Sequence, residues 1–239
     1  MNDVMKAIQE RHSDRVAFDA NRPVTNEELR QVLEAGRWAP TAHNMQNFEI
    51  IVVDGKGVLQ RIGGIRSRIS IEFLRENYQQ LSFSKEELMR KKTGILGSGF
   101  PPSWRNPAKL DEVARRSSPS PLRQRIDGSP VILIVIYDPR KRAPASKGDV
   151  LGFMSLGCVM ENMWLMAQSL GLSLQILSVF GNILVEKEVK RILKIPKHMK
   201  IAYASRLGHP VSAPPRRLRV RRDIQDFTYH NTYGCKWVD

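Results

Sequence analysis

Hydrophobic positions at helical spacing mark several segments of the chain. Thr25, with Glu28 three residues later, forms a capping-box pattern directly ahead of an apolar series, and such a pattern starts helices. We therefore predict a helix over 25–37 that ends near Gly36. A looser helical period predicts that 57–78 is mostly helical, and the stretch VEKEVKRILKI predicts a short amphipathic helix.

Four other segments have the apolar, β-branched composition of strands. The first runs from Phe48 to Val53 and is followed by the turn pair Asp54-Gly55. PVILIVIYD at 130–138 is a continuous apolar run, which is typical of a strand covered on both faces. GLSLQIL and KIAYASRLGHP complete the set. Because helices alternate with a few strands, the fold class is α+β or α/β. The chain has no internal repeat and no composition break that forces two domains, so we predict one domain over 1–239.

The segment 150–170 is apolar nearly all round, which predicts a buried helix. In a chain of this size, such a helix belongs at the centre of a domain or of a dimer. We interpret its methionines as core filling.

Residues 79–129 have a different character. Gly, Pro, Ser and Arg dominate, and periodicity is weak, although Ser84 and Glu87 could cap a short helix. Long loops of this kind are functional or disordered. We therefore describe 79–129 as a basic insert.

Composition narrows the class of protein. The chain has 239 residues, 41% of them hydrophobic, and a formal net charge of +14. This balance attracts anions such as nucleotides, phosphates, nucleic acid or acidic lipid. The two cysteines, Cys158 and Cys235, have no metal-site spacing and provide no disulfide framework. Without a signal-like apolar core or an 18-residue apolar run, we predict a soluble cytoplasmic protein with no metal and no membrane span.

Familiar catalytic motifs are missing from the sequence. It contains no GxxxxGK[ST], GxGxxG, HExxH or GxSxG pattern, and its five histidines are scattered. No nucleophile–base pair can be argued from such a pattern. We infer that a bound cofactor carries the chemistry.

Three clusters contain the candidate binding residues. They are RHSDRVAF at 11–18, WAPTAHNMQNF at 38–48 and RRLRVRRDIQDF at 216–227. A charge run such as the first can also be a solvated face. Arginines at the alternate positions 217, 219 and 221 would share one side of an extended segment. That side could grip a phosphate through paired hydrogen bonds.

In this order, the clusters resemble the motifs of the nitroreductase family of FMN-dependent oxidoreductases. The first block matches R-[RH]-S-x-[RK]-x-F, with Phe18 one residue late. The second resembles APSxxNxQPWxF, with Asn47 in place of proline and Phe48 in place of tryptophan. CVMENMWLMAQSLGL is similar to the family's central helix, and the tail matches at Arg219 and Arg221, with Asp223 where proline is expected.

This resemblance implies an α+β fold. In the family it is a three-layer sandwich whose mixed, mainly antiparallel sheet is flanked by helices, in an intertwined homodimer with two active sites at the interface. The residues that the motifs assign to FMN binding are Arg11, His12, Ser13, Arg15, Pro40, Thr41, Ala42, Asn44, Gln46, Phe180, Gly181, Arg219 and Arg221.

The resemblance also implies separate tasks for these residues. Arg11, Ser13, Arg219 and Arg221 would hold the FMN phosphate. Arg15 would lie near the pyrimidine edge of the ring. Pro40, Thr41 and Asn44 would approach from the second subunit, and a main-chain N–H of Phe180 or Gly181 would face flavin N5 and O4.

The implied reaction has two steps. NADPH or NADH delivers hydride to flavin N5, and a nitroaromatic, a quinone or another flavin is then reduced at the same site. We expect the basic insert to lie near the entrance and influence substrate choice. Flavin fragmentation, dehalogenation and heterocycle oxidation also occur in the family and stay open. Charge alone would suggest a nucleic-acid-binding protein, but the sequence has neither aromatic–basic interleaving nor a clear helix-turn-helix. The expected partners are a second copy and a small acceptor, with no nucleic acid.

Overall fold

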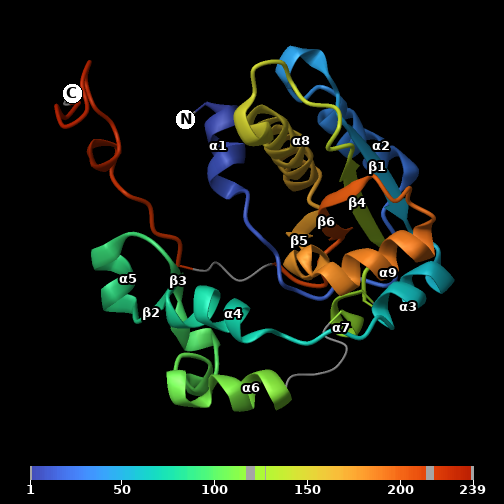
Figure 1. Cartoon of the computed structure of the whole chain (residues 1–239), viewed down its shortest axis with the longest axis horizontal. Coiled ribbons are helices and arrows are strands. Elements are labelled where there is room, and N and C mark those ends of the chain that lie inside the picture. Colours follow the sequence, from blue (N-terminus) through green and yellow to red (C-terminus); the bar gives the residue numbers. More distant parts are fainter. Residues whose placement is uncertain (1, 117–121, 127, 214–217, 238–239) are drawn as a thin grey trace. The chain divides into compact units, whose positions relative to one another are not determined.

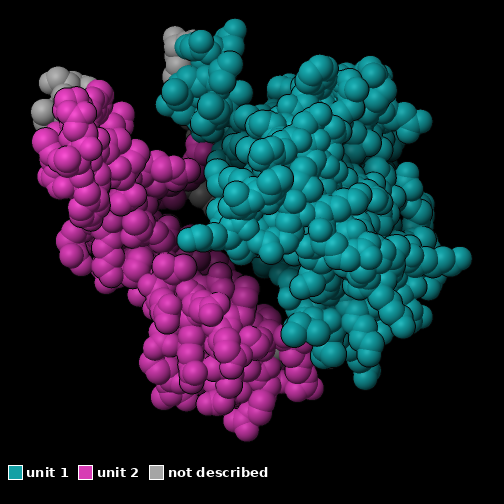
Figure 2. Space-filling model, turned by 45° about the horizontal axis from the view of Figure 1, so that its top comes forward, with its two compact units in different colours: residues 1–67, 120–214 teal, residues 68–119, 215–239 magenta. Residues whose placement is uncertain are grey.

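The computed structural model describes residues 2–116, 122–126, 128–213 and 218–237. The predicted phosphate-gripping position 217 lies outside these residues. The chain divides into two compact units, coloured separately in Figure 2: unit 1 is 1–67 with 120–214, and unit 2 is 68–119 with 215–239. The predicted single domain over 1–239 stays a prediction.

A four-stranded antiparallel sheet forms the middle layer of unit 1. Its strands are β1 (Phe48–Val53), β4 (Val131–Tyr137), β5 (Ser173–Ile176) and β6 (Lys200–Gly208), in the spatial order β1-β4-β6-β5. All seven residues of β4 are buried, as the continuous apolar run predicts. The mainly antiparallel sheet flanked by helices confirms the predicted α+β class.

Helices cover both faces of this sheet (Figure 1). On one face, α3 (Lys56–Gly63), α7 (Arg123–Ile126) and α9 (Ile183–Leu193) enclose a core with Ile132, Ile134 and Ile136 of β4. On the other, α2 (Asn26–Arg37) and α8 (Val150–Ser169) enclose a second core with Leu133 and Val135. Alternation along β4 sends successive side chains to opposite cores. The result is a helix–sheet–helix sandwich.

The N-terminal helices show why the local predictions hold. α2 begins at the predicted capping box, in which the Thr25 hydroxyl accepts from the Glu28 N–H at 3.2 Å and the Glu28 carboxylate accepts from the Thr25 N–H. Helix α1 (Asp3–Glu10) precedes it, capped by Asn2. The expectation of a mostly helical 57–78 is only partly right. α3 ends at Gly63, and helix resumes at α4 (Ile71–Leu74), because glycines at 63 and 64 end the helical run.

Helix α8 packs on the sheet with one side only. Leu156, Val159, Met163 and Ala167 are buried, whereas Val150, Phe153 and Met154 are more than half exposed. The predicted all-round burial is therefore not met within this chain. The stretch Lys147–Ser169 is long and apolar enough to cross a membrane by length and composition, a test that core helices also pass.

Unit 2 is built from short elements around an aromatic cluster. A π-helical turn (Arg75–Gln79) follows α4, and next come β2 (Ser82–Phe83), α5 (Lys85–Lys91), β3 (Ile95–Leu96) and α6 (Leu110–Arg116). The rings of Tyr78, Phe100 and Trp104 contact one another with centroids 4.4 to 6.1 Å apart. Much of the predicted basic insert is thus ordered, and α5 starts at the expected Ser84 cap.

Candidate functional site

The segment 11–18 leaves α1 and follows the edge of the sheet in unit 1. The Trp164 indole N–H donates to the His12 carbonyl at 3.2 Å, and the Asp14 N–H donates to the Leu174 carbonyl at 3.3 Å. Phe18 then forms an isolated antiparallel bridge with Pro210. These contacts join residues about 150 to 200 positions apart, and they fix the backbone of the first cluster.

Arg11 lies against the central helix. Its guanidinium carbon is 4.7 Å from the centre of the Trp164 ring, and its Nε is 3.2 Å from Glu161 Oε1. Arg11 is the first residue after α1 and its backbone is no longer helical. A guanidinium has five donors in a fixed fork, a geometry that suits oxyanions such as carboxylates and phosphates.

His12, Asp14 and Arg15 face different surroundings. His12 Nε2 lies 2.7 Å from Asp14 Oδ1, and His12 Nδ1 lies 2.6 Å from the Glu10 carbonyl. Asp14 is 3% exposed, whereas Arg15 is exposed and donates to the Ser13 carbonyl at 3.4 Å. The segment therefore turns Asp14 inward and presents the arginine outward.

The second cluster is a compact loop between α2 and β1 with an unusual backbone. His43, Asn44 and Gln46 have φ values of 51°, 51° and 43°, a left-handed conformation that is uncommon for residues other than glycine. The loop is held by the Thr41 hydroxyl, which accepts from the Gln46 N–H at 3.2 Å, and by the Ser155 hydroxyl of α8, which accepts from the Ala42 N–H at 3.0 Å. Backbone strain of this kind clusters at ligand sites.

Within that loop the predicted contact residues differ in exposure. Pro40, Asn44 and Gln46 are exposed, while Thr41 and Ala42 are half-buried. The amide of Gln46 also donates to Asn44 Oδ1 at 3.0 Å. The loop thus exposes polar side chains and a rigid proline at the surface of the chain.

Two further predicted contacts lie in the 3₁₀ turn Ser178–Gly181, which connects β5 to α9. Phe180 is 1% exposed and packs in the core below α9. Its N–H donates to the Leu177 carbonyl at 3.3 Å, whereas Gly181 is exposed. Of the two predicted main-chain donors, Gly181 is therefore the one at the surface.

Arg219 and Arg221 belong to unit 2, so each is described there. Both are exposed, and Arg221 donates to the Val220 carbonyl at 2.8 Å. Their segment is tied to the insert by Lys92, the C-cap residue of α5, which pairs with Asp223 and lies 3.9 Å from Asp226. The tail and the insert thus share one unit.

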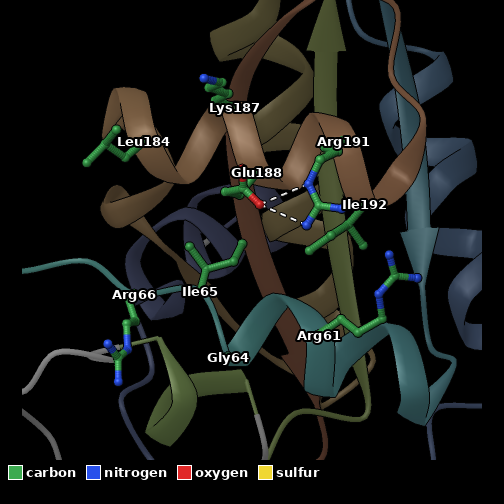
Figure 3. Close-up of a pocket in the computed structure, with 9 residues that line it drawn as sticks. All are labelled: Arg61, Gly64, Ile65, Arg66, Leu184, Lys187, Glu188, Arg191 and Ile192. Atoms are coloured by element: carbon green, nitrogen blue, oxygen red, sulfur yellow. Dashed lines mark hydrogen bonds and ion pairs between the residues drawn. The ribbon is translucent and has the colours of Figure 1, made fainter.

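A hollow of about 410 Å³ lies between the C-terminal end of α3 and α9 (Figure 3). Ile65 and Ile192 form its buried floor. Lys187 and Arg66 point away from that floor in Figure 3, and Arg191 is paired with Glu188 at 2.9 Å. The cations around this hollow therefore do not converge on one point, and none of the predicted cofactor-binding residues lines it.

Sequence reasoning missed several residues that shape the first cluster. Trp164 and Glu161 contact Arg11 from α8, and Arg206 of β6 donates to the Val16 carbonyl at 2.6 Å. The sequence YASRLG contains a signal for Arg206, because an arginine within a mainly apolar strand is unusual. The contacts of Trp164 and Glu161 leave no comparable signal, because they depend on how α8 docks.

The chain is similar to known proteins in sequence and in fold. A model of the nitroreductase family matches residues 8–209. An NADH dehydrogenase/NAD(P)H nitroreductase structure from Parabacteroides distasonis is 18% identical, with a TM-score of 0.59 over 98% of this chain and 100% of that one.

Two further solved structures have the same fold. A nitroreductase with bound FMN from Desulfitobacterium hafniense is 21% identical, with a TM-score of 0.59 over 96% of this chain and 99% of that one. NfrA1 of B. megaterium is 15% identical, with a TM-score of 0.62 over 97% and 75% of the two chains. Because the family model spans most of the sequence, the chain belongs to the nitroreductase family.

Proposed function

We propose that this protein is an FMN-dependent oxidoreductase that takes hydride from NADPH or NADH and passes it to a nitroaromatic, a quinone or a similar acceptor. The observation that carries the proposal is the first cluster: Arg11 is held against Trp164, beside an anchored backbone that presents Arg15 outward. Solved family members with bound FMN add support.

The residues of the chain fit the chemical parts of this cofactor. Arg11 and Ser13 would hold the phosphate dianion through charge-assisted hydrogen bonds. Arg15 would stabilise negative charge at the pyrimidine edge of the ring. The strained loop with Pro40, Thr41, Ala42, Asn44 and Gln46 would line the site. FMN, when bound, supplies hydride acceptance and donation.

In this proposal, the protein contributes to catalysis by positioning the flavin, the nicotinamide and the acceptor. The chain contributes no evident nucleophile–base pair, and solvent can supply the protons of acceptor reduction. Gly181 at the surface of the 3₁₀ turn would offer a main-chain N–H to the ring. Stacking of nicotinamide and acceptor on the same ring would bring the reacting atoms together in turn.

A homodimer is part of the proposal. Apolar side chains of α1 (Val4, Met5 and Ile8) and of α8 (Val150, Phe153 and Met154) are 43% to 65% exposed, and these helices contact each other in unit 1. Exposed apolar side chains gathered on neighbouring helices are typical of an interaction site. Phe153→Asp should give a monomer in sedimentation analysis, with weakened FMN retention. A dimeric Phe153→Asp variant would contradict this assignment of the interface.

The decisive experiment for the activity is simple. The purified protein should be yellow, release FMN on denaturation and oxidise NADPH or NADH when a nitroarene or quinone is added. Arg11→Gln should lower FMN retention. A colourless protein that takes up no FMN would refute the proposal, and binding of DNA by that colourless protein with a steep salt dependence would favour a nucleic-acid-binding function.

A further inference from the structure

Arg206 is a buried charged side chain in unit 1. It belongs to β6, opposite Gln175 of β5 and Ile132 of β4, and is 4% exposed. Burying a guanidinium is unfavourable unless hydrogen bonds replace its water. Burial lowers the pKa of Arg206 to about 10, the Arg125 guanidinium adds to this effect, and Asp14 opposes it. The side chain is still protonated at neutral pH.

Two neutral acceptors bind the Arg206 guanidinium. Arg206 Nε donates to Gln175 Oε1 at 2.8 Å, and its Nη2 donates to the Val16 carbonyl at 2.6 Å. Its guanidinium carbon is 4.5 Å from the centre of the Phe18 ring. The same Gln175 oxygen accepts a longer bond of 3.4 Å from Arg125. One planar fork therefore grips the sheet through Gln175 and the segment 11–18 through Val16 and Phe18.

The position of these contacts along the segment is informative. The Trp164 indole holds the His12 carbonyl on one side of Ser13 and Arg15, and Arg206 holds the Val16 carbonyl on the other. Between these two contacts, Asp14 is buried and Arg15 is exposed. The hydrogen bonds to the His12 and Val16 carbonyls therefore fix the backbone on both sides of Ser13 and Arg15, and with it the direction in which these two side chains face.

We propose that Arg206 is a positioning residue for flavin binding, whose guanidinium fork holds residues 13–16 so that Ser13 and Arg15 present their side chains to the cofactor. The inference rests on the proposed function. Arg206 does not itself touch the cofactor in this proposal. A lysine could reach one of the two acceptors, but it lacks the planar fork that bonds both and stacks on Phe18.

The test compares three variants of the purified holoenzyme. Arg206→Gln and Arg206→Lys probe the fork, and Val189→Ala is the control, because it truncates a fully buried core side chain of α9 and lowers stability. FMN dissociation constants come from equilibrium dialysis, midpoint potentials from dye equilibration, and stability from thermal unfolding.

The readouts separate positioning from general stability. Arg206→Gln should bind FMN about tenfold to a hundredfold more weakly, with a more negative flavin potential because Arg15 no longer faces the ring. Arg206→Lys should be intermediate, and Val189→Ala should keep both values close to wild type while melting earlier. The more conservative Arg206→Lys carries the test if Arg206→Gln does not fold.

The outcomes are distinct. A wild-type protein that takes up no FMN overturns the proposed function and this inference together. A wild type that binds FMN, with Arg206→Gln or Arg206→Lys matching it in affinity and potential, overturns the inference alone. A loss in Arg206→Gln no larger than in Val189→Ala also overturns it, because the effect would then be one of stability.

Discussion

Gly208, the last residue of β6, lies where the chain leaves no room for a side chain. A Cβ atom at this position would approach Phe18 Cγ to 2.7 Å and Pro130 Cγ to 2.8 Å, closer than such atoms come in real structures. Phe18 has little freedom to move away. Its backbone is bridged to Pro210, and its ring stacks under Arg206. Gly208→Ala should therefore strain the contact between the sheet and the segment 11–18.

The size of the effect follows from this geometry. Overpacking of a well-filled core costs about 1–3 kcal/mol. For a chain of this length, each kcal/mol lowers the melting temperature by roughly 2–4 °C. Gly208→Ala should therefore melt about 2–12 °C below wild type. FMN retention should fall in parallel, because the displaced Phe18 is two residues from Val16.

Differential scanning calorimetry with a matched glycine measures this. Gly57 lies in the first turn of α3, and a Cβ there would meet no atom within 4 Å. Gly57→Ala should leave the melting temperature unchanged or raise it slightly, since alanine favours helix by up to about 1 kcal/mol over glycine. If Gly208→Ala and Gly57→Ala have the same melting temperature, Phe18 and Pro130 move aside without an energetic cost and the packing argument is refuted.

Three further predictions concern stability. Thr25→Ala removes the cap of α2 and should lower the free energy of unfolding by about 1 kcal/mol in urea titration, whereas Thr25→Ser should not. The hydrogen bonds from Arg140, against the opposing effect of burial, hold the pKa of Asp138 well below its usual range. Since this folded-state pKa is lowered, the stabilisation is present above the unfolded value of 3.8 and is lost as pH falls below it. The free energy of unfolding of Asp138→Asn should therefore fall less on acidification than that of the wild type. Lys92→Met removes the ion pair with Asp223, and limited proteolysis of the tail should become faster; equal rates would contradict that role.

Local signals in the sequence predicted most elements of unit 1. β1 was predicted at 48–53 and has those bounds, and the expected strand at 130–138 is observed as Val131–Tyr137. The helix predicted over 150–170 is Val150–Ser169. Capping residues and β-branched runs act within a few positions, so they can be recognised without the rest of the chain. The glycines at 63 and 64 were a comparable signal for the break in 57–78.

Contacts between distant positions could not be predicted in this way. Arg206 and Val16 are 190 residues apart, and Lys92 and Asp223 are 131 apart. No periodicity reports such a pair. Motif matching to the family proposed which residues bind FMN, but it was silent on what holds them. The contacts of Trp164 and Arg206 with the segment 11–18 can be recognised only from the tertiary structure, in which α8 and β6 lie beside that segment.

The exposed apolar residues of α8 allow an energy balance to be drawn for the proposed homodimer. Burying a side chain such as Val150, Phe153 or Met154 from full exposure is worth about 1.5–3 kcal/mol. Each of the three is 52% to 61% exposed in one chain, so together they supply roughly 2.5–5 kcal/mol per chain. Association costs an estimated 4–15 kcal/mol or more in lost freedom. Two copies of the α8 face alone therefore come close to break-even. The exposed residues of α1 must join them for a stable dimer, which would bury about 2,000 Å² or more. Since α1 leads directly into Arg11, the surface that would bind the second copy is continuous with the residues proposed to bind the cofactor.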